Sequence, residues 1–324
     1  MEQTQMLRLA TAAQADQPGA SPAAPTTYAL VIEPDQGLSA IYNLIASATQ
    51  SIDMTMYELT DTTVTSMLAA AAAKGIAVRV ILDQNYERQS NTTAYNYLSA
   101  NNVSVNWANP VYACTHQKTI TVDQATSAIL TLNLVTEDYP TSRDFAVITK
   151  DPADVAAIET TFNADFANAA ITPPTGDNLV WSPTNSRSSL LALLNGATTS
   201  LLIAQEEMAD TDIENALEAA LARSVAVTLI QENLNGKYDS ILNAYKSDGA
   251  NIAVYTTENG YYIHAKVILA DYGTPQATLF IGSENFSTDS LNDNRELGLI
   301  FNDPTCMAAI QTALTADYNG GTKL

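Results

Sequence analysis

The sequence predicts an α/β fold built from two copies of one unit, and three observations support this prediction. Strand-like and helix-like segments alternate along the chain of 324 residues. The order of segments in residues 28–172 recurs in residues 173–324, which indicates an internal duplication. A hydrophobic fraction of 46% with 15% charged residues is typical of a chain that buries a core. We therefore expect two mixed sheets, each flanked by helices.

Residues 1–27 are expected to form a flexible leader, because they are rich in Ala, Gln, Thr and Pro and lack apolar periodicity. They also lack the basic start and unbroken apolar region of an intact signal peptide. Residues 13–15 could be the remnant of a cleavage region, and a plain linker fits equally well. From this leader and the low Lys and Arg content we expect a secreted or periplasmic protein. The sequence contains no run of about 18 apolar residues, so no membrane span is predicted.

The first part of each copy starts with a proline, Pro34 or Pro183. An amphipathic helix follows, then an apolar strand that ends at Glu58 or Glu207, and then an Ala-rich helix. Equivalent positions in this part are 149 residues apart, as Glu58 and Glu207 are. The next strands are predicted at Ile76–Leu82 and Val225–Gln231.

The second part of each copy is predicted to contain a hairpin-like pair of strands and a C-terminal helix. The offset is 148 residues from His116 to His264 and becomes 152 from Asn133 to Asn285, after an insertion near Tyr272–Gln276. Such length changes are usual in loops. The Pro-Pro-Thr-Gly-Asp segment at 173–177 is the expected joint between the copies. The C-terminal helices are predicted at Asp154–Asn168 and Thr305–Tyr318.

Both histidines of the chain begin the same pattern, His-x-Lys-x-x-x-x-Asp. Its members are His116, Lys118 and Asp123 in copy one, and His264, Lys266 and Asp271 in copy two. Residues i and i+2 of a strand project from one face, so the His and Lys are expected to point together. The Asp has the opposite parity and is expected to anchor the strand. One such histidine could be a structural residue, but its recurrence in a repeat favours a functional role.

The pattern favours an anion over a metal ion. An ammonium group beside an imidazole opposes a bound cation, whereas two lysines give charge-assisted hydrogen bonds to phosphoryl oxygens. Downstream, an Asn precedes an acid by 11 residues in both copies, Asn133 before Asp144 and Asn285 before Glu296. Asn is a neutral donor to phosphate, and a carboxylate behind an imidazole fixes its tautomer.

These paired motifs resemble the HKD signatures of the phospholipase D superfamily, and the resemblance covers nearly everything from residue 28 onward. It implies two α/β copies around a pseudo-twofold axis, with one active site at their interface and no metal or cofactor. The implied reaction proceeds in two steps through a covalent phosphohistidine. By this resemblance His116 is the nucleophile and His264 the acid and base. The two imidazoles and two ammonium groups are expected to titrate as a coupled set.

The same resemblance assigns the remaining site residues. Lys118, Lys266, Asn133 and Asn285 would bind the phosphate, with help from Thr131 and Ser283. Asp144 and Glu296 would orient the histidines, and a crosswise arrangement between the copies is one open option. The sequence departs from the family pattern at Leu130, where a Gly is expected before Thr131. Since Gly allows close approach of a ligand to the backbone, the first half-site is expected to be looser or differently shaped.

Three functional hypotheses remain open, two of them defined by the substrate. The first is a phospholipid whose headgroup phosphodiester is hydrolysed or transphosphatidylated. The second is a nucleic acid cut by an endonuclease or exonuclease, which a net charge of −21 and only 14 Lys and Arg residues disfavour. The third is a noncatalytic phosphate-binding protein, which two intact motifs disfavour. Aromatic residues of the predicted loops could meet lipid or lie in the core: Tyr86, Tyr95, Tyr97, Trp107, Tyr112, Tyr255, Tyr261 and Tyr262.

The oligomeric state and the cysteines complete the expectations. Because one chain carries both half-sites, a monomer is expected to be sufficient for activity. Cys114 and Cys306 are compatible with one disulfide or with two buried thiols, and their spacing fits no zinc site.

Overall fold

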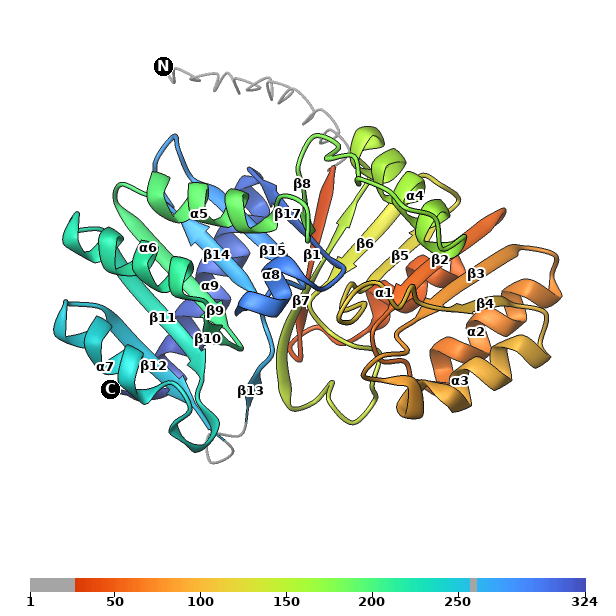
Figure 1. The fold of residues 1–324 in the computed structure, drawn as a ribbon, viewed down its shortest axis with the longest axis horizontal. Helices are drawn as coiled ribbons and strands as arrows, with labels where there is room; N and C mark the ends of the chain where they lie inside the picture. The colour runs from red at the N-terminus through yellow and green to blue at the C-terminus, as the bar shows by residue number, and fades with distance from the viewer. Residues whose placement is uncertain (1–26, 257–260) are drawn as a thin grey trace, which may run out of the picture.

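A computed structural model describes residues 27–256 and 261–324 of the chain. These residues form two halves that lie side by side, each built on one mixed β-sheet with helices against it (Figure 1). The predicted α/β fold class is confirmed. The predicted leader lies outside the described residues, apart from Thr27.

The elements of the first half occur in the following order. They are β1 (Tyr28–Glu33), α1 (Ser39–Ala46), β2 (Ser51–Met56), α2 (Thr62–Ala73), β3 (Ala77–Leu82), α3 (Arg88–Ala100), β4 (Ser104–Trp107), β5 (Thr119–Val122), β6 (Thr126–Leu130), β7 (Ser142–Thr149) and α4 (Pro152–Phe166).

The second half repeats this order with a few short additions. Its elements are β8 (Leu179–Ser182), α5 (Ser186–Gly196), β9 (Ser200–Gln205), β10 (Met208–Ala209), α6 (Thr211–Ala222), β11 (Ala226–Glu232), a 3-10 turn (Leu234–Gly236), α7 (Asp239–Ser247), β12 (Asn251–Tyr255), β13 (Tyr262–Ile263), β14 (Val267–Ala270), β15 (Thr278–Gly282), β16 (Phe286–Ser287), α8 (Thr288–Asn292), β17 (Glu296–Phe301), α9 (Pro304–Gly320) and β18 (Thr322–Lys323).

The two sheets have the same strand order, which shows the duplication in three dimensions. The first runs β1-β7-β6-β5-β2-β3-β4 and the second β8-β17-β15-β14-β9-β11-β12. The strands β2, β3 and β4 pair in parallel, as do β9, β11 and β12, and the others in these two series pair antiparallel. Each sheet gains an eighth strand, β13 beside β7 and β18 beside β12.

Each half also contains a helix and a strand that the sequence pattern did not predict. These are α3 with β4, and α7 with β12. The helix α3 buries only Asn91, Ala94 and Leu98, so its polar composition conceals the helical period. A third strand, β7 or β17, also follows the predicted hairpin-like pair and extends the sheet.

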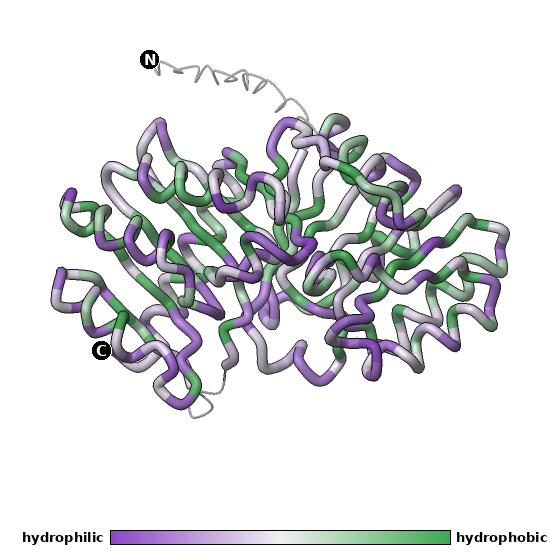
Figure 2. The backbone as a smooth tube through the Cα atoms, in the orientation of Figure 1, coloured by the Kyte–Doolittle hydropathy of each residue, from purple (hydrophilic) through white to green (hydrophobic). Residues whose placement is uncertain are grey.

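Helices cover both faces of each sheet. Apolar side chains of α1, α2 and α3 form one core with the first sheet, and those of α5, α6 and α7 form another with the second. Figure 2 shows that the strands are mainly hydrophobic and that the most hydrophilic segments lie in loops. The C-terminal helix α4 packs against the opposite face of the first sheet, and α9 packs against the opposite face of the second.

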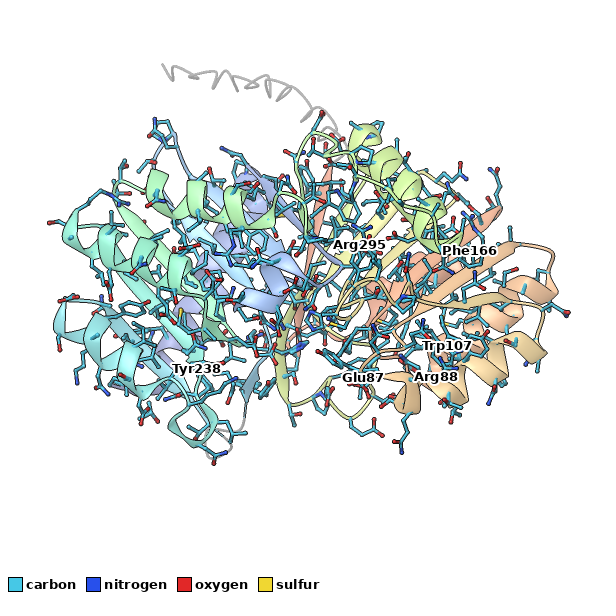
Figure 3. The ribbon with its side chains drawn as sticks, in the orientation of Figure 1. Glu87, Arg88, Trp107, Phe166, Tyr238 and Arg295 are labelled. Carbon is cyan, nitrogen blue, oxygen red and sulfur yellow. The ribbon has the colours of Figure 1, made fainter. Side chains whose placement is uncertain are left out.

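A third core joins the two halves. It includes Phe145 of β7 and Trp181 of β8, both fully buried. Two buried ion pairs cross the same boundary. Arg143 Nε lies 2.8 Å from Asp317 Oδ2, and Arg295 Nη2 lies 2.9 Å from Asp165 Oδ1. Figure 3 shows Arg295 at this boundary. The reciprocal pairs and the shared core fix how the halves face each other.

The last residue of each motif anchors its strand, as the parity argument predicts. The carboxylate of Asp123 accepts hydrogen bonds from the backbone N–H groups of 49–51 at 2.7–3.1 Å. Asp271 does the same with 198–200 over the same range of distances. Burial acts to raise the pKa of both carboxyls, but these hydrogen bonds outweigh it and lower each pKa to about 2.

Candidate active site

A cavity of about 590 Å³ lies between the two halves, and both motif histidines line it. Chain segments that lead into the motifs pair with the opposite half. The strand β13, just before His264, pairs in parallel with the start of β7. In the first half, the backbone N–H of His116 donates to Arg295 O at 2.9 Å. Each histidine is thereby brought beside an acid of the other copy.

The two histidines are held crosswise. His116 Nδ1 lies 2.8 Å from Glu296 Oε2, and His264 Nδ1 lies 2.9 Å from Asp144 Oδ1. A carboxylate only accepts hydrogen bonds, so Nδ1 carries the proton in each contact. The Nε2 atoms remain for the cavity, where one can attack and the other can transfer a proton.

Further side chains hold the two acids in place. Thr131 Oγ1 donates to Asp144 at 2.5 Å, and the backbone N–H of Phe145 donates to that hydroxyl. Glu296 Oε1 accepts from Ser290 Oγ at 2.9 Å and from Asn294 Nδ2 at 3.0 Å. These contacts leave the carboxylates little freedom to turn away from the imidazoles.

The expected role of Thr131 and Ser283 in phosphate binding needs correction. Both side chains are fully buried, and each hydroxyl has only one proton to donate. The Thr131 hydroxyl is engaged by Asp144, and the Ser283 hydroxyl contacts the backbone of Leu297. Their side chains point behind the site because they belong to the segments that support its acids.

The two motif lysines lie beneath the histidines. Lys118 and Lys266 are 1% and 0% exposed, and each ammonium donates to the backbone carbonyl of its own motif histidine, at 2.6 and 2.5 Å. Burial, reinforced by the charge of Lys266, lowers the pKa of Lys118 to about 7. Burial also lowers the pKa of His116, against the opposing effect of Glu296.

The expected phosphate donors Asn133 and Asn285 both line the cavity. The amide oxygen of each is buried and has no hydrogen-bond partner within residues 27–256 and 261–324. The Asn285 amide nitrogen donates to Glu206 Oε2 at 3.1 Å. Both amides thus lie at the cavity, where the amide nitrogen, and not the unpaired oxygen, is the atom that can donate to a phosphoryl oxygen.

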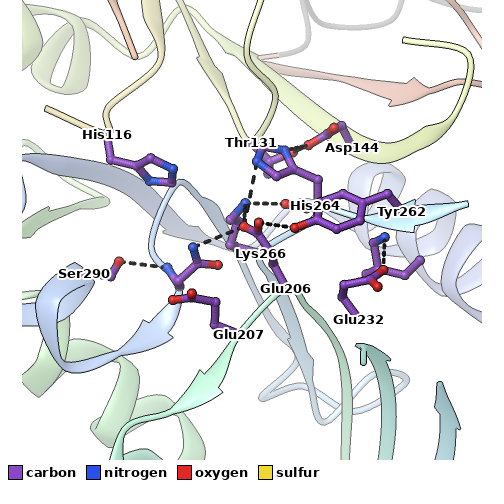
Figure 4. Close-up of polar contacts among 12 residues, drawn as sticks. His116, Thr131, Asp144, Glu206, Glu207, Glu232, Tyr262, His264, Lys266 and Ser290 are labelled. Carbon is purple, nitrogen blue, oxygen red and sulfur yellow. Dashed lines mark hydrogen bonds and ion pairs between the residues drawn. The ribbon is translucent and has the colours of Figure 1, made fainter. Parts of the chain in front are cut away.

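The half-sites differ at a position that the sequence analysis missed. Glu206 follows β9 and reaches Lys266, whereas the equivalent Tyr57 follows β2 and packs edge-on against His116, with ring centroids 4.7 Å apart. Figure 4 shows Glu206 beside Lys266 and Tyr262. The repeat alignment placed both residues one position before Glu58 and Glu207, so comparison of the two copies at that point could have found the difference.

The substitution at Leu130 also has a different meaning from the expected one. Its counterpart Gly282 makes room for a side chain rather than for a ligand, because an added Cβ would lie 2.3 Å from Glu284 Oε2 and 2.5 Å from Gly298 Cα. Glu284 is fully buried, and burial raises the pKa of its carboxyl well above the ordinary value. In the first half Leu132 occupies the matching position, so Leu130 and Leu132 fill this space with apolar packing.

The aromatic residues that the sequence left open lie in several environments, and Tyr97 is exposed at the surface. Tyr86 and Tyr262 line the cavity, Tyr255 is buried, and Tyr95 stacks on Trp107 with centroids 4.3 Å apart. Cys114 and Cys306 are two buried free thiols, so the disulfide alternative is excluded in this structure.

The arrangement agrees with the sequence resemblance. A family model described as cardiolipin synthase, PLD-like domain, matches residues 41–166 and 190–318, one stretch in each half. The chain belongs to the phospholipase D superfamily. No curated protein matches this superfamily member significantly in sequence.

Solved structures support the fold of this phospholipase D-like chain. Phosphatidylserine synthase from Haemophilus influenzae Rd KW20 aligns with a TM-score of 0.69 and 13% identity, covering 92% of this chain and 87% of its own. Polyphosphate kinase from Porphyromonas gingivalis aligns with a TM-score of 0.72 and 16% identity, covering 89% of this chain. The chain corresponds to 46% of that kinase. At these identities the similarity establishes the fold alone.

Within residues 27–256 and 261–324 no helix is long and apolar enough to cross a membrane. The same residues contain no group of three or more His, Cys, Asp or Glu side chains arranged to hold a metal ion.

Proposed function

We propose that this protein is a phosphodiesterase that hydrolyses or transphosphatidylates the headgroup phosphodiester of a phospholipid through a phosphohistidine, without a metal ion. The observation that carries the proposal is the crosswise pair of imidazoles, whose Nε2 atoms share one cavity above two buried ammonium groups. Such a site can supply a nucleophile, a proton donor and a clamp for phosphoryl oxygens.

In the proposed first step, His116 Nε2 attacks phosphorus and a nitrogen–phosphorus bond forms. The bond from phosphorus to the headgroup oxygen breaks, and protonated His264 gives its Nε2 proton to that oxygen. In the second step, His264 takes a proton from water or an alcohol as its oxygen attacks phosphorus. The nitrogen–phosphorus bond then breaks, and both histidines return to their starting protonation states. Lys118, Lys266 and the two Asn amides would hold the phosphoryl oxygens in both steps.

The charge of the cavity favours a lipid headgroup over a polynucleotide. Six carboxylates line it, and the motif lysines lie buried beneath the histidines. A polyanion would be repelled along this surface, whereas a single phosphodiester needs only the local clamp. The lining acids are Glu33, Asp138, Asp144, Glu206, Glu207 and Asp289. A nuclease of the same superfamily is the second candidate.

The test is a metal-free assay of two substrates side by side. In EDTA, headgroup alcohol should be released from zwitterionic phospholipid micelles, and His116→Ala and His264→Ala should abolish the release. Cleavage of a single-stranded oligonucleotide with a steep salt dependence would instead identify a nuclease. Phosphate binding without turnover of either substrate would identify a noncatalytic protein. Loss of turnover in EDTA would contradict the histidine mechanism.

The pKa shifts predict an activity profile displaced towards low pH. His116 must be neutral to attack, and its lowered pKa keeps it neutral to a lower pH than an ordinary histidine. Lys118 must be charged to bind phosphate, and it loses its proton as the pH rises through about 7. We therefore expect kcat/KM of the free enzyme to fall above about pH 7.

A Lys118→Arg variant tests whether Lys118 causes this fall of kcat/KM at high pH, which we call the alkaline limb of the profile. Arginine keeps its charge at high pH, so Lys118→Arg should move the alkaline limb to higher pH even if it lowers the maximum rate. The measurement is kcat/KM against pH for both proteins. A limb at the same pH in both would rule out Lys118 as its origin.

A further inference from the structure

In the second half, a carboxylate of the protein itself lies where a phosphate is expected. Glu206 Oε2 is 2.7 Å from Lys266 Nζ and 3.8 Å from His264 Nε2, and it accepts a hydrogen bond from Asn285 Nδ2 at 3.1 Å. The Tyr262 hydroxyl donates to Glu206 Oε1 at 2.5 Å. Glu206 therefore uses the same ammonium and amide groups that the proposed function assigns to the substrate phosphate (Figure 4).

The first half contains no matching charge. Tyr57 occupies the equivalent position, and Lys118 Nζ lies over its ring at 4.9 Å from the centroid. Within the part of the chain that the structure describes, no carboxylate lies within ion-pair distance of Lys118. The two half-sites thus differ by one negative charge at the point where phosphoryl oxygens would bind.

Glu206 is held in its ionised form. Burial by itself would raise the pKa of its carboxyl, but Lys266, His264 and the Tyr262 hydroxyl together hold that pKa well below the ordinary value. The ion pair with Lys266 cancels one of the two ammonium charges beneath the site. One lysine, Lys118, then remains without an ionic partner among the described residues to attract an anion.

We infer that Glu206 is a charge-selecting residue, which admits phosphodiesters with one negative charge and excludes phosphate groups with two. This inference rests on the proposed function, because it assumes that the phosphoryl group binds between the two motifs. A diester can share Lys266 and Asn285 with the carboxylate, or displace it, and still be neutralised by Lys118. A phosphate monoester or inorganic phosphate brings a second charge, which the Glu206 carboxylate repels at short range and low dielectric constant.

The test compares the binding of two small anions by the full chain. Methyl phosphate is the doubly charged probe and dimethyl phosphate the singly charged one, at about pH 7, one unit above the second pKa of a phosphate monoester, about 6, and no higher than the pKa of Lys118, about 7. Affinities are measured by calorimetry for the wild type, Glu206→Gln and Glu207→Gln. Glu207 also lines the cavity but pairs with Lys237 at 3.6 Å, so its variant changes the net charge equally without freeing Lys266.

Glu206→Gln should bind methyl phosphate about ten- to a hundredfold more tightly than the wild type, with a smaller gain for dimethyl phosphate. Glu207→Gln should change both affinities much less. Equal gains for the two anions in Glu206→Gln, or none, would overturn the inference. Thermal unfolding verifies that the variant folds, and Glu206→Ala replaces it if it does not.

The outcome separates this inference from the proposed function, because binding is measured without turnover. If the wild type turned over no phosphodiester but Glu206→Gln gained phosphate affinity selectively, the proposed function would fail and the selectivity would stand. If the wild type turned over phosphodiesters and the ratio of affinities did not change, the role of Glu206 would fail alone.

Discussion

Replacing His116 with Ala is expected to lower kcat by about ten thousandfold or more, because the proposed reaction then has no nucleophile. The equivalent His264→Ala change should have a comparable effect on a phospholipid, whose alkoxide leaving group needs a proton. Both side chains line the cavity and pair with buried carboxylates, so thermal unfolding of each variant verifies that it still folds.

The two histidines can be told apart with a phosphodiester that has an acidic aryl alcohol as its leaving group. Such an alcohol leaves without protonation, so His264→Ala should release about one equivalent in a burst and then stall as a phosphohistidine on His116. His116→Ala should give no burst. If an acid-labile phosphohistidine were found on His264 instead, His264 would be the nucleophile and His116 the acid and base. If neither variant gave a burst, the covalent route would be contradicted.

The second large effect is expected from the crosswise acids. Glu296→Gln and Asp144→Asn should each lower kcat by about a hundred- to ten thousandfold, because an amide can donate to Nδ1 and stabilise the wrong tautomer. Glu296 contacts the proposed nucleophile, so its variant should lose the burst with the aryl substrate. Asp144 contacts the proposed acid, so its variant should keep the burst and lose the second step.

Glu207→Gln provides the control for these variants, because it removes a cavity carboxylate that contacts neither histidine. Rapid-quench kinetics on the three proteins measures the burst and the steady state separately. If Asp144→Asn removed the burst and Glu296→Gln preserved it, each acid would serve the opposite step from the one that the contacts indicate. Wild-type rates in both would show that the acids only stabilise the fold.

Much of the fold could be predicted because each helix or strand assigned in one copy could be checked against its equivalent in the other. The motif Asp residues were expected to anchor strands, and Asp123 and Asp271 do so with the same hydrogen bonds in both copies. The helix α3 was missed because a surface helix with few apolar residues has a weak period. Thr131 was assigned to phosphate because the sequence gives residue type and spacing but not the direction of a side chain at the end of a strand.

The sequence by itself determined the family, the duplicated α/β fold, the His–Lys motifs and the acids that accompany them, because repeated spacing needs no three-dimensional information. Only the tertiary structure decided the partners. His116 and Glu296 are 180 residues apart, and His264 and Asp144 are 120 apart, so no local period links them. They meet because a shared core and two reciprocal ion pairs set the halves face to face. Within the second half, the pairing of β9 with β14 placed Glu206 on Lys266 and made two similar half-sites electrostatically unequal.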